Sequence, residues 1–326
     1  NRSDKLILLN RRIESTVKEF YLNSLEEMSN QFSNLLNKIS YLVSIIDVIV
    51  SSAKCAIQYN YVKPEIMDSS EDSSSQVDIK GLRHPIIERL EETGQYIGND
   101  IQLSDREENL GILLYGVNGV GKSSLGKALG INIVLAQMGM YVACEEMRYI
   151  PYTKIFTRIN GDDNIFKGMS SFVLEMNELK SIIKFADQNS IVLGDEICKG
   201  TEEISALSII TSCIQNFHDK GVNFVMATHF HKLCDLQSIR ELKGIRMKHL
   251  SVHYDDEKDI MIYGRKLIDG AGDTLYGIEI AKYILKDDLF INRAFQVRKE
   301  LLNIDVDLIP GKKSNYSTQL YMDCCN

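Results

Sequence analysis

A glycine-rich octapeptide constrains the fold of this 326-residue chain more than any other feature of its sequence. Residues 116–123 read GVNGVGKS and fit the pattern G-x-x-x-x-G-K-[ST]. The pattern directly follows the apolar, strand-like residues 112–115 and precedes a helical stretch, which is the context that a phosphate-binding loop requires. Glycines let backbone N–H groups converge on phosphate oxygens, and the N-terminus of the helix adds partial positive charge. The sequence therefore predicts a nucleotide-phosphate site between a strand and a helix.

Two acidic residues at the end of a second apolar run complete the predicted site. The run IVLG at residues 191–194 leads into Asp195 and Glu196. Lys122 is suited to bridge the β- and γ-phosphates, while the Ser123 hydroxyl and Asp195 are suited to hold Mg²⁺. Glu196 is suited to polarise the attacking water as a general base. The expected nucleotide contacts run through the loop into the helix: Gly116, Val117, Asn118, Gly119, Val120, Gly121, Lys122, Ser123 and Ser124.

A pair of histidines follows a third apolar run. Residues 222–227 predict a strand, and Thr228 and His229 come at its carboxyl end, where ligand sites of α/β sheets lie. His229 is therefore a candidate sensor of the γ-phosphate, although a histidine in this position is more often structural or exposed to solvent. His229 and His231 also have the spacing of a zinc pair, but no third ligand follows nearby, which disfavours zinc.

Short apolar runs alternate with helical stretches from Gly81 onward, and this alternation predicts a mostly parallel α/β sheet. The runs interpreted as strands are residues 111–115, 141–144, 191–193 and 223–227. The stretches interpreted as helices are residues 122–138, 172–188 and 203–220. A hairpin over residues 251–257 and 259–268 is expected next, followed by two short helices over residues 276–285 and 288–302.

The N-terminal part of the chain contains neither glycine nor proline before Pro64. Its apolar residues recur at steps of three and four, which predicts one long amphipathic helix, or two end to end, over residues 1–63. Periodicity alone favours a coiled-coil-like arm or dimer stalk over a lever that joins the nucleotide site to a distant part. Residues 64–80 are rich in serine and aspartate and are expected to form a flexible surface loop.

Composition limits the partners that the chain can have. The net charge of −8 argues against wrapping nucleic acid over the whole surface, because neutralising phosphates requires lysine and arginine to dominate. No uninterrupted apolar run approaches the roughly 18 to 20 residues of a membrane span, so no membrane association is expected. Seven scattered cysteines without a CxxC pair are typical of free thiols in a reducing, intracellular compartment. Because it begins at Asn1, the chain is expected to be a piece of a longer polypeptide.

Several motifs together resemble the MutS family of DNA mismatch-repair ATPases. The matching segments, in the family's order, are R-H-P at 83–85, N-D at 99–100, GVNGVGKSS at 116–124, IFTRINGDD at 155–163, SSFVLEM at 170–176 and DEICKGT at 195–201. Asn118 matches the family loop G-P-N-x-x-G-K-S-T, from which this chain departs by Val117 for proline and Ser124 for threonine. Lys199 likewise replaces the arginine of D-E-x-x-R-G-T. The resemblance extends roughly over residues 40–302.

The resemblance implies a P-loop, ABC-type ATPase domain over residues 81–269 that uses ATP and Mg²⁺. It also implies a short helical dimerisation element over residues 270–303 and therefore a homodimer. In such a dimer Ser170, at a helix N-terminus, is expected to reach the γ-phosphate held by the other subunit. Tyr96 stands where the family places an aromatic ring that stacks on adenine. The helices of residues 1–63 then become a lever and core between the ATPase and a DNA clamp.

Departures from the family pattern also carry information. Residues 202–206 read EEISA where many members have S-T-x-D-G, which puts details of the signalling between subunits in doubt. G-T-E followed by S-A is similar to a divergent branch found in large DNA viruses and octocoral mitochondria. Residues 304–326 are expected to be a tail, either unstructured or leading into the HNH-type nuclease module of that branch. The mismatch-reading domain with its F-x-E motif does not occur in this sequence, so DNA binding is expected of the longer protein and is weak or absent here.

Three functions remain open from the sequence. The leading hypothesis is the ATP-hydrolysing engine of a mismatch-repair-type protein, in which ATP closes two subunits and drives a DNA clamp. The second is a MutS homologue that acts in recombination or structure-specific DNA processing without mismatch recognition. The third is a tethering or transport ATPase with the same core, although the L-S-G-G-Q-like signature of those proteins does not occur in this sequence.

Overall fold

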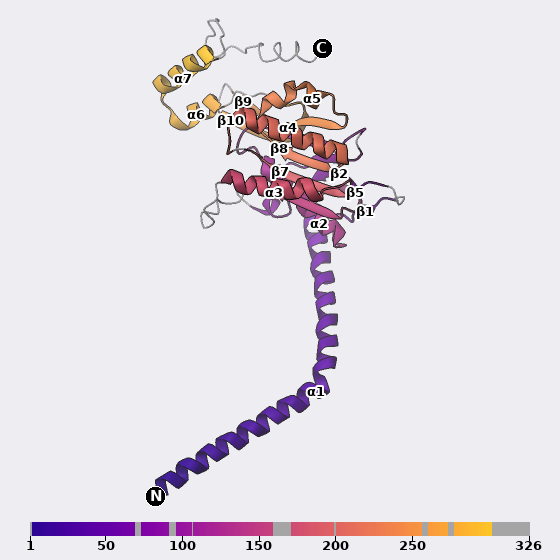
Figure 1. The fold of residues 1–326 in the computed structure, drawn as a ribbon, viewed down its shortest axis with the longest axis vertical. Coiled ribbons are helices and arrows are strands. Elements are labelled where there is room, and N and C mark those ends of the chain that lie inside the picture. Colours follow the sequence, from indigo (N-terminus) through magenta and orange to yellow (C-terminus); the bar gives the residue numbers. More distant parts are fainter. Residues whose placement is uncertain are drawn as a thin grey trace. The chain divides into compact units, whose positions relative to one another are not determined.

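The computed structural model describes residues 2–68, 73–90, 96–105, 107–158, 171–198, 200–255, 260–272 and 277–301. The chain divides into two compact units, residues 1–60 and residues 61–326. The first unit is a single long helix, and the second holds two β-sheets and the other helices (Figure 1).

The first unit consists of α1 (Arg2–Tyr59), one continuous helix of 58 residues. Serine hydroxyls along it donate to the carbonyl one turn earlier, as from Ser44 Oγ to Ser40 O at 2.8 Å. Its large apolar side chains are exposed, Phe20 by 74%. An 18-residue window in α1 has a mean hydropathy of at least 1.2 and at most two charged residues, enough by length and composition to cross a membrane. The sequence still has no uninterrupted apolar run of that length, since serines and charged residues interrupt it, but these interruptions leave the mean hydropathy of the window high.

The core of the second unit is a six-stranded sheet in the order β10-β9-β4-β8-β7-β6. Its strands are β4 (Gly111–Tyr115), β6 (Lys154–Arg158), β7 (Ser190–Asp195), β8 (Asn223–Ala227), β9 (Ile245–Asp255) and β10 (Ile260–Asp269). Neighbouring strands are parallel except for β9 and β10, which form the predicted antiparallel hairpin. The predicted α/β class with largely parallel strands is confirmed for this sheet.

Helices pack on both faces of the six-stranded sheet (Figure 1). Every residue of β4, β7 and β8 is buried, as expected for parallel strands between two helical layers. Along β4 the side chains alternate between two apolar cores. Leu114 shares one core with α2 (Lys122–Gln137), whereas Leu113 shares the other with α3 (Ser171–Phe185) and α4 (Glu203–Lys220). The ends of these strands therefore lie in a closely packed part of the second unit.

A second sheet has four strands in the order β1-β5-β2-β3. The strands are β1 (Glu65–Ile66), β2 (Gln76–Leu82), β3 (Asn99–Leu103) and β5 (Glu146–Ile150). The prediction of a flexible loop over residues 64–80 is wrong where β1 and the first part of β2 lie. In β2 the buried Val77 and Ile79 alternate with partly exposed polar residues, which is the pattern of a half-buried strand.

The strand predicted over residues 141–144 is also wrong. Val142 makes only an isolated bridge with Val62, and β5 starts further on, at Glu146. The apolar residues Val142, Ala143 and Cys144 of this segment are buried in the core. A short apolar run can therefore be buried without pairing as a strand of a β-sheet.

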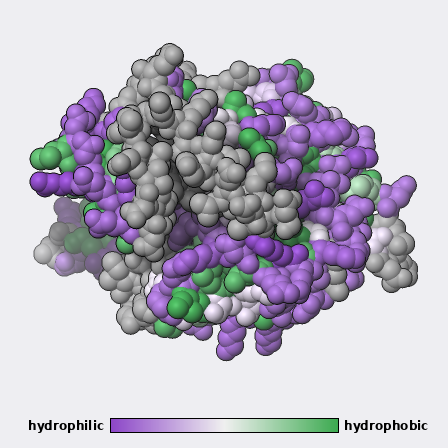
Figure 2. All heavy atoms as spheres, turned by 90° about the horizontal axis from the view of Figure 1, so that it is seen from above, coloured by the Kyte–Doolittle hydropathy of each residue, from purple (hydrophilic) through white to green (hydrophobic). Residues whose placement is uncertain are grey.

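The remaining elements are short. They are η1 (Ile87–Arg89), η4 (His231–Asp235), α5 (Gln237–Arg240), α6 (Gly277–Leu285) and α7 (Asp288–Leu301). α6 and α7 correspond to the two short helices predicted after the hairpin, whereas the tail over residues 304–326 lies outside the described residues. Figure 2 shows hydrophilic residues over much of the described part of one face, with apolar residues in small groups among them.

Candidate nucleotide-binding site

The three predicted parts of the site meet at one edge of the six-stranded sheet. β4, β8 and β7 are parallel neighbours, so the residues that follow their carboxyl ends lie at the same edge. The loop of residues 116–121 follows β4, the acidic pair stands at the end of β7, and the histidine segment follows β8. Thr228 N donates to Leu114 O and Glu196 N donates to Ala227 O, both at 3.0 Å. These bonds tie the three strand ends together.

The loop after β4 has the backbone of a phosphate cradle. Gly116, Gly119 and Gly121 have φ values of 144°, 83° and 113°, which L side chains rarely adopt. A Cβ on Gly116 would also lie 3.0 Å from Val120 Cγ1. Gly121 is the N-cap of α2, so the unpaired N–H groups of the first helical turn face the loop. An anion is the ligand that such a loop and helix end are built to bind.

Lys122 opens α2, and its side chain is only 5% exposed. Its ammonium donates to Gly116 O at 2.5 Å and to Val117 O at 3.3 Å. The same Nζ lies 3.8 Å from Glu196 Oε1. A phosphate oxygen is a stronger acceptor for an ammonium than a neutral carbonyl, so Lys122 is placed to exchange the loop carbonyls for a phosphate.

Ser123 and Asp195 line one small cavity, together with Lys122. Asp195 is buried and is the last residue of β7. A hydroxyl and a carboxylate are oxygen ligands of the kind that Mg²⁺ takes alongside phosphate oxygens and water. The two side chains therefore fit the role of magnesium ligands.

Glu196 lies in a tight turn just beyond β7. Its φ of 50° is unusual for a residue other than glycine. The next residue, Ile197, packs back under the strand, since a Cβ on Gly194 would lie 2.9 Å from Ile197 Cδ1. The Glu196 carboxylate is buried and faces the ammonium of Lys122. The turn thus directs this carboxylate toward the loop that follows β4, and the role of Glu196 as general base stays a prediction.

His229 follows β8 and is exposed, with its ring centroid 4.2 Å from that of Phe230. His231 is half-buried, and its ring centroid lies 5.0 Å from that of Tyr115 at the end of β4. Burial lowers the pKa of His231, and the charges of His229 and Lys122 lower that pKa further. From the sequence, His231 is a candidate only for a zinc site, whereas the structure places it near Lys122.

Tyr96 lies just before β3 and is half-buried. Burial raises the pKa of Tyr96; the charge of Glu88 raises that pKa further and the charge of Arg265 lowers it. Asn99, from the N-D motif, joins the two sheets: its Nδ2 donates to Arg265 O at 3.0 Å, and its Oδ1 accepts from Leu267 N at 2.7 Å. Asn99 therefore has a structural role, and the stacking of Tyr96 on adenine stays a prediction.

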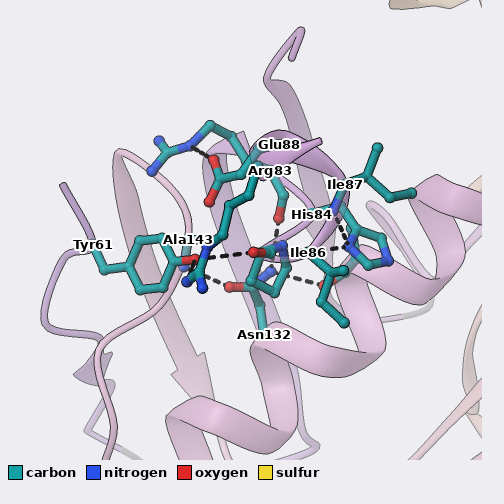
Figure 3. A network of polar contacts seen from close by, with 11 residues as sticks. Tyr61, Arg83, His84, Ile86, Ile87, Glu88, Asn132 and Ala143 are labelled. Atoms are coloured by element: carbon teal, nitrogen blue, oxygen red, sulfur yellow. Dashed lines mark hydrogen bonds and ion pairs between the residues drawn. The ribbon is translucent and has the colours of Figure 1, made fainter. Parts of the chain in front are cut away.

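The R-H-P motif belongs to a polar network beside α2 (Figure 3). Arg83 Nε donates to Glu88 Oε2 at 2.7 Å. Asn132 of α2 donates to Arg83 O at 3.0 Å and accepts from Ala143 N at 2.7 Å. Figure 3 shows these side chains converging between α2 and the neighbouring loops. This network attaches the motif to the helix that begins at the phosphate loop.

His84, which belongs to the same network, is expected to make the stability of the folded chain depend on pH. Its Nδ1 accepts from Ile86 N at 3.2 Å and Ile87 N at 3.3 Å, and burial lowers its pKa from the ordinary 6.5. Burial favours the neutral form of the His84 ring in the folded state. The contribution of His84 to the free energy of unfolding is therefore present above the pKa that this residue has in the unfolded chain, and it is lost as the pH falls through the lower pKa of the folded state. We expect a lower urea midpoint at about pH 5.5 than at about pH 7.5.

His84→Asn supplies the comparison for this prediction, because the asparagine Oδ1 can accept from the same two N–H groups without titrating. The pH dependence of the urea midpoint is expected to be smaller in His84→Asn than in the wild-type chain. An equal pH dependence in the two proteins would show that His84 does not contribute.

Two residues near the site could not be singled out from the sequence. Glu175 of α3 accepts a hydrogen bond from Cys198 N at 2.7 Å, and Arg158 at the end of β6 pairs with the same helix. The matching segment SSFVLEM at residues 170–176 contains Glu175, but only the fold shows what Glu175 contacts. Ser170 lies outside the described residues, so its contact with the γ-phosphate of another subunit stays a prediction.

Known proteins similar to this chain identify its family. The family model of MutS domain V matches residues 112–302. A DNA mismatch repair mutS homolog of Acanthamoeba polyphaga mimivirus is 37% identical over 98% of this chain and 31% of its own length. The mitochondrial DNA mismatch repair mutS homolog of Sarcophyton glaucum is 36% identical over 97% of this chain and 32% of its own length. MutS of Fusobacterium nucleatum is 33% identical over 91% of this chain and 32% of its own length.

The chain thus spans less than a third of the length of these relatives. The viral and coral mitochondrial relatives confirm the predicted similarity to that branch. The matched family model covers both the phosphate loop and the acidic pair at the end of β7. Together these matches show that the chain belongs to the MutS family.

Proposed function

We propose that this chain is the ATP-hydrolysing engine of a MutS-type protein. The observation that carries the proposal is the meeting of Lys122, Ser123, Asp195 and Glu196 at one sheet edge, in a chain of the MutS family. An ABC-type ATPase is the family architecture that fits this arrangement. Ser123 and Asp195 would hold Mg²⁺, which supplies positive charge to the phosphates when it is bound.

The chain's own residues account for binding and hydrolysis of ATP. The N–H groups of residues 116–121 and of the start of α2 bind the phosphates, and Lys122 contacts the β- and γ-phosphates. Glu196 accepts a proton from the attacking water, and His229 senses the γ-phosphate. Tyr96 stacks on adenine. The products are ADP and inorganic phosphate.

The proposed active unit is a homodimer. Ser170 of one copy reaches the γ-phosphate bound by the other, and α6 and α7 form the helical dimerisation element. Apolar side chains on these helices support this role, since Ile284 is exposed by 67%, Leu289 by 64% and Phe290 by 56%. A second copy of the chain would cover these exposed apolar side chains in the proposed dimer. ATP binding closes the pair of subunits, and hydrolysis reopens it.

The longer protein is proposed to couple this cycle to a clamp on DNA in mismatch repair, because its relatives are named DNA mismatch repair proteins. Weak or no DNA binding is proposed for these 326 residues, given their net charge of −8. The alternative is a MutS homologue for recombination or structure-specific DNA processing. Preference of the full-length protein for branched DNA over mismatched duplex would favour that alternative. Family membership argues against a tethering or transport ATPase.

We infer that the apolar surface of α1 packs against protein as a lever and core helix and does not enter a membrane. The similarity to the viral DNA mismatch repair homolog extends over 98% of this chain, so it includes α1. An intracellular, reducing compartment is proposed as well. Cys55, Cys144, Cys198, Cys213 and Cys234 are free thiols in the described residues, which fits such a compartment.

A concentration series of ATPase assays tests the proposed function. The rate of phosphate release per chain is expected to rise with protein concentration and then to saturate, because the active unit is a dimer. The variant Lys122→Ala serves as the blank. A constant rate per chain, with sedimentation showing monomers, would contradict the composite site. Absence of any rate above the blank, at every concentration, would contradict ATP hydrolysis by this chain.

A further inference from the structure

Glu175 is a buried carboxylate that the proposed chemistry does not use. It lies in α3 and is 5% exposed. Its Oε1 accepts a hydrogen bond from Cys198 N at 2.7 Å. Cys198 follows Glu196 with only Ile197 between them. Glu175 is therefore bonded to the turn that carries the proposed general base.

The backbone of this turn depends on its surroundings. Glu196 and Cys198 have φ values of 50° and 65°, and residues other than glycine keep such values only where neighbouring groups hold them. Cys198 and Ile197 are buried, so water does not replace a lost acceptor for the Cys198 N–H. The Glu196 N–H donates to Ala227 O at 3.0 Å. The turn is thus attached to β8 at one end and to α3 at the other.

Arg158 and Cys198 are the neighbours of the Glu175 side chain that bear on its role. Arg158 Nε lies 3.9 Å from Glu175 Oε1 and 3.0 Å from Glu178 Oε2. Burial and the nearby Glu175 carboxylate raise the pKa of the Cys198 thiol to about 12, so the thiol stays neutral beside it. The 2.7 Å hydrogen bond from Cys198 N is therefore the contact through which Glu175 holds the turn.

We propose that Glu175 is a positioning residue for ATP hydrolysis: its hydrogen bond to Cys198 N orients the turn so that the Glu196 carboxylate faces the attacking water. The inference rests on the proposed function, which assigns Glu196 as the base. Glu175 acts through the turn and not on the nucleotide. Loss of the bond lets the turn tilt, and a misplacement of about 1 Å lowers a rate by about a hundredfold. The phosphate loop keeps its own geometry, so the affinity for ATP is retained.

Three variants of the full chain test this role. Glu175→Met keeps the length of the side chain but removes the acceptor, and Glu175→Gln keeps an oxygen that accepts from Cys198 N. Glu178→Gln is the matched control, because Glu178 lies on the same helix, pairs with Arg158 and is 44% exposed. Steady-state ATP hydrolysis is measured for each variant, together with the thermal midpoint.

For Glu175→Met we expect kcat to fall by about tenfold to a hundredfold while KM stays within about threefold of the wild-type value. Glu175→Gln is expected to recover most of kcat, and Glu178→Gln is expected to match the wild-type chain. A wild-type kcat in Glu175→Met would overturn the proposal. A parallel loss of kcat, affinity for ATP and thermal midpoint would also overturn it, because that pattern indicates a general packing role.

Residue-resolved hydrogen exchange examines the same contact without ATP hydrolysis. In Glu175→Met the amides of Cys198 and Glu196 are expected to exchange at least about tenfold faster than in the wild-type chain, and in Glu175→Gln they stay protected. Unchanged exchange at both amides in Glu175→Met would overturn the proposal whatever the rate of hydrolysis. If the wild-type chain releases no phosphate, the proposed function fails by itself. Faster exchange in Glu175→Met would then still support the positioning of the turn.

Discussion

Lys122→Ala is expected to lower the rate of ATP hydrolysis by at least about a hundredfold, because it removes the cation that stabilises charge on the transferred phosphate. The ammonium of Lys122 is already held inside the loop by Gly116 O and Val117 O. Phosphate release at saturating ATP measures the effect on turnover. Titration with a fluorescent ATP analogue measures the accompanying loss of affinity.

The control for this prediction is Lys127→Ala. Lys127 lies on the same helix, α2, but is exposed to solvent, so its removal is expected to leave hydrolysis close to the wild-type rate. Turnover by Lys122→Ala at the wild-type rate would mean that the phosphate loop has been assigned wrongly.

The second large effect is expected from Glu196→Gln. The glutamine keeps the shape of the side chain but cannot accept a proton from water, so hydrolysis is expected to fall by about a hundredfold or more. ATP binding is expected to persist, because Lys122 and the loop are unchanged. The variant should therefore accumulate as a closed, ATP-bound dimer. Single-turnover phosphate release and sedimentation in the presence of Mg²⁺ and ATP measure the two effects.

Glu203→Gln serves as the control for Glu196→Gln. Glu203 is an exposed carboxylate at the start of α4, paired with Lys232 at 3.0 Å. Its replacement is expected to change neither hydrolysis nor dimer formation. Wild-type hydrolysis by Glu196→Gln would show that another group is the base. Slow hydrolysis without accumulation of the dimer would contradict the link between ATP binding and closure.

The arrangement of the sheet edge that carries the candidate site could be predicted because each of its parts is encoded locally. The glycines of residues 116–121 indicate a phosphate-binding type of loop, and such a loop is followed directly by a helix. α2 begins at Lys122 as expected. The apolar residues of β7 and β8 are buried on both faces, so their runs are continuous and end at the acidic pair and at Thr228. Parallel pairing then places these ends together.

The second sheet was harder to predict because its strands do not have such runs. β2 follows a segment rich in serine and aspartate, and only Val77, Ile79 and Leu82 mark its buried face. Residues 141–144 misled in the opposite direction, since Val142, Ala143 and Cys144 are apolar and buried but the segment makes a single bridge. Whether a short apolar run joins a strand ladder depends on which partner strand the rest of the fold brings beside it.

The contacts of Asn99 and Glu175 could not be predicted at all. Asn99 bonds to the backbone of β10, and Glu175 bonds to the turn after β7, so each partner is distant in sequence. Both residues belong to segments that resemble MutS motifs, but a motif does not show which way a side chain points or what it contacts. The roles of Ser170 and Tyr96 stay predictions that rest on the resemblance.

In the proposed dimer each ATP site is completed by a second copy of the chain, and mixing two inactive variants tests this composite site most directly. Lys122→Ala removes the lysine from a chain's own site, whereas Ser170→Ala removes the serine that it contributes to its partner's site. Each variant alone is expected to be nearly inactive, because every site lacks one of the two groups. In an equal mixture, random pairing restores one complete site in half of the dimers.

The measurement is the phosphate-release rate of that equal mixture after the subunits have exchanged. A rate of about a quarter of the wild-type value is expected, since one site in four is complete in a randomly paired population. A mixture no more active than the two variants measured separately, with subunit exchange demonstrated, would contradict the composite site.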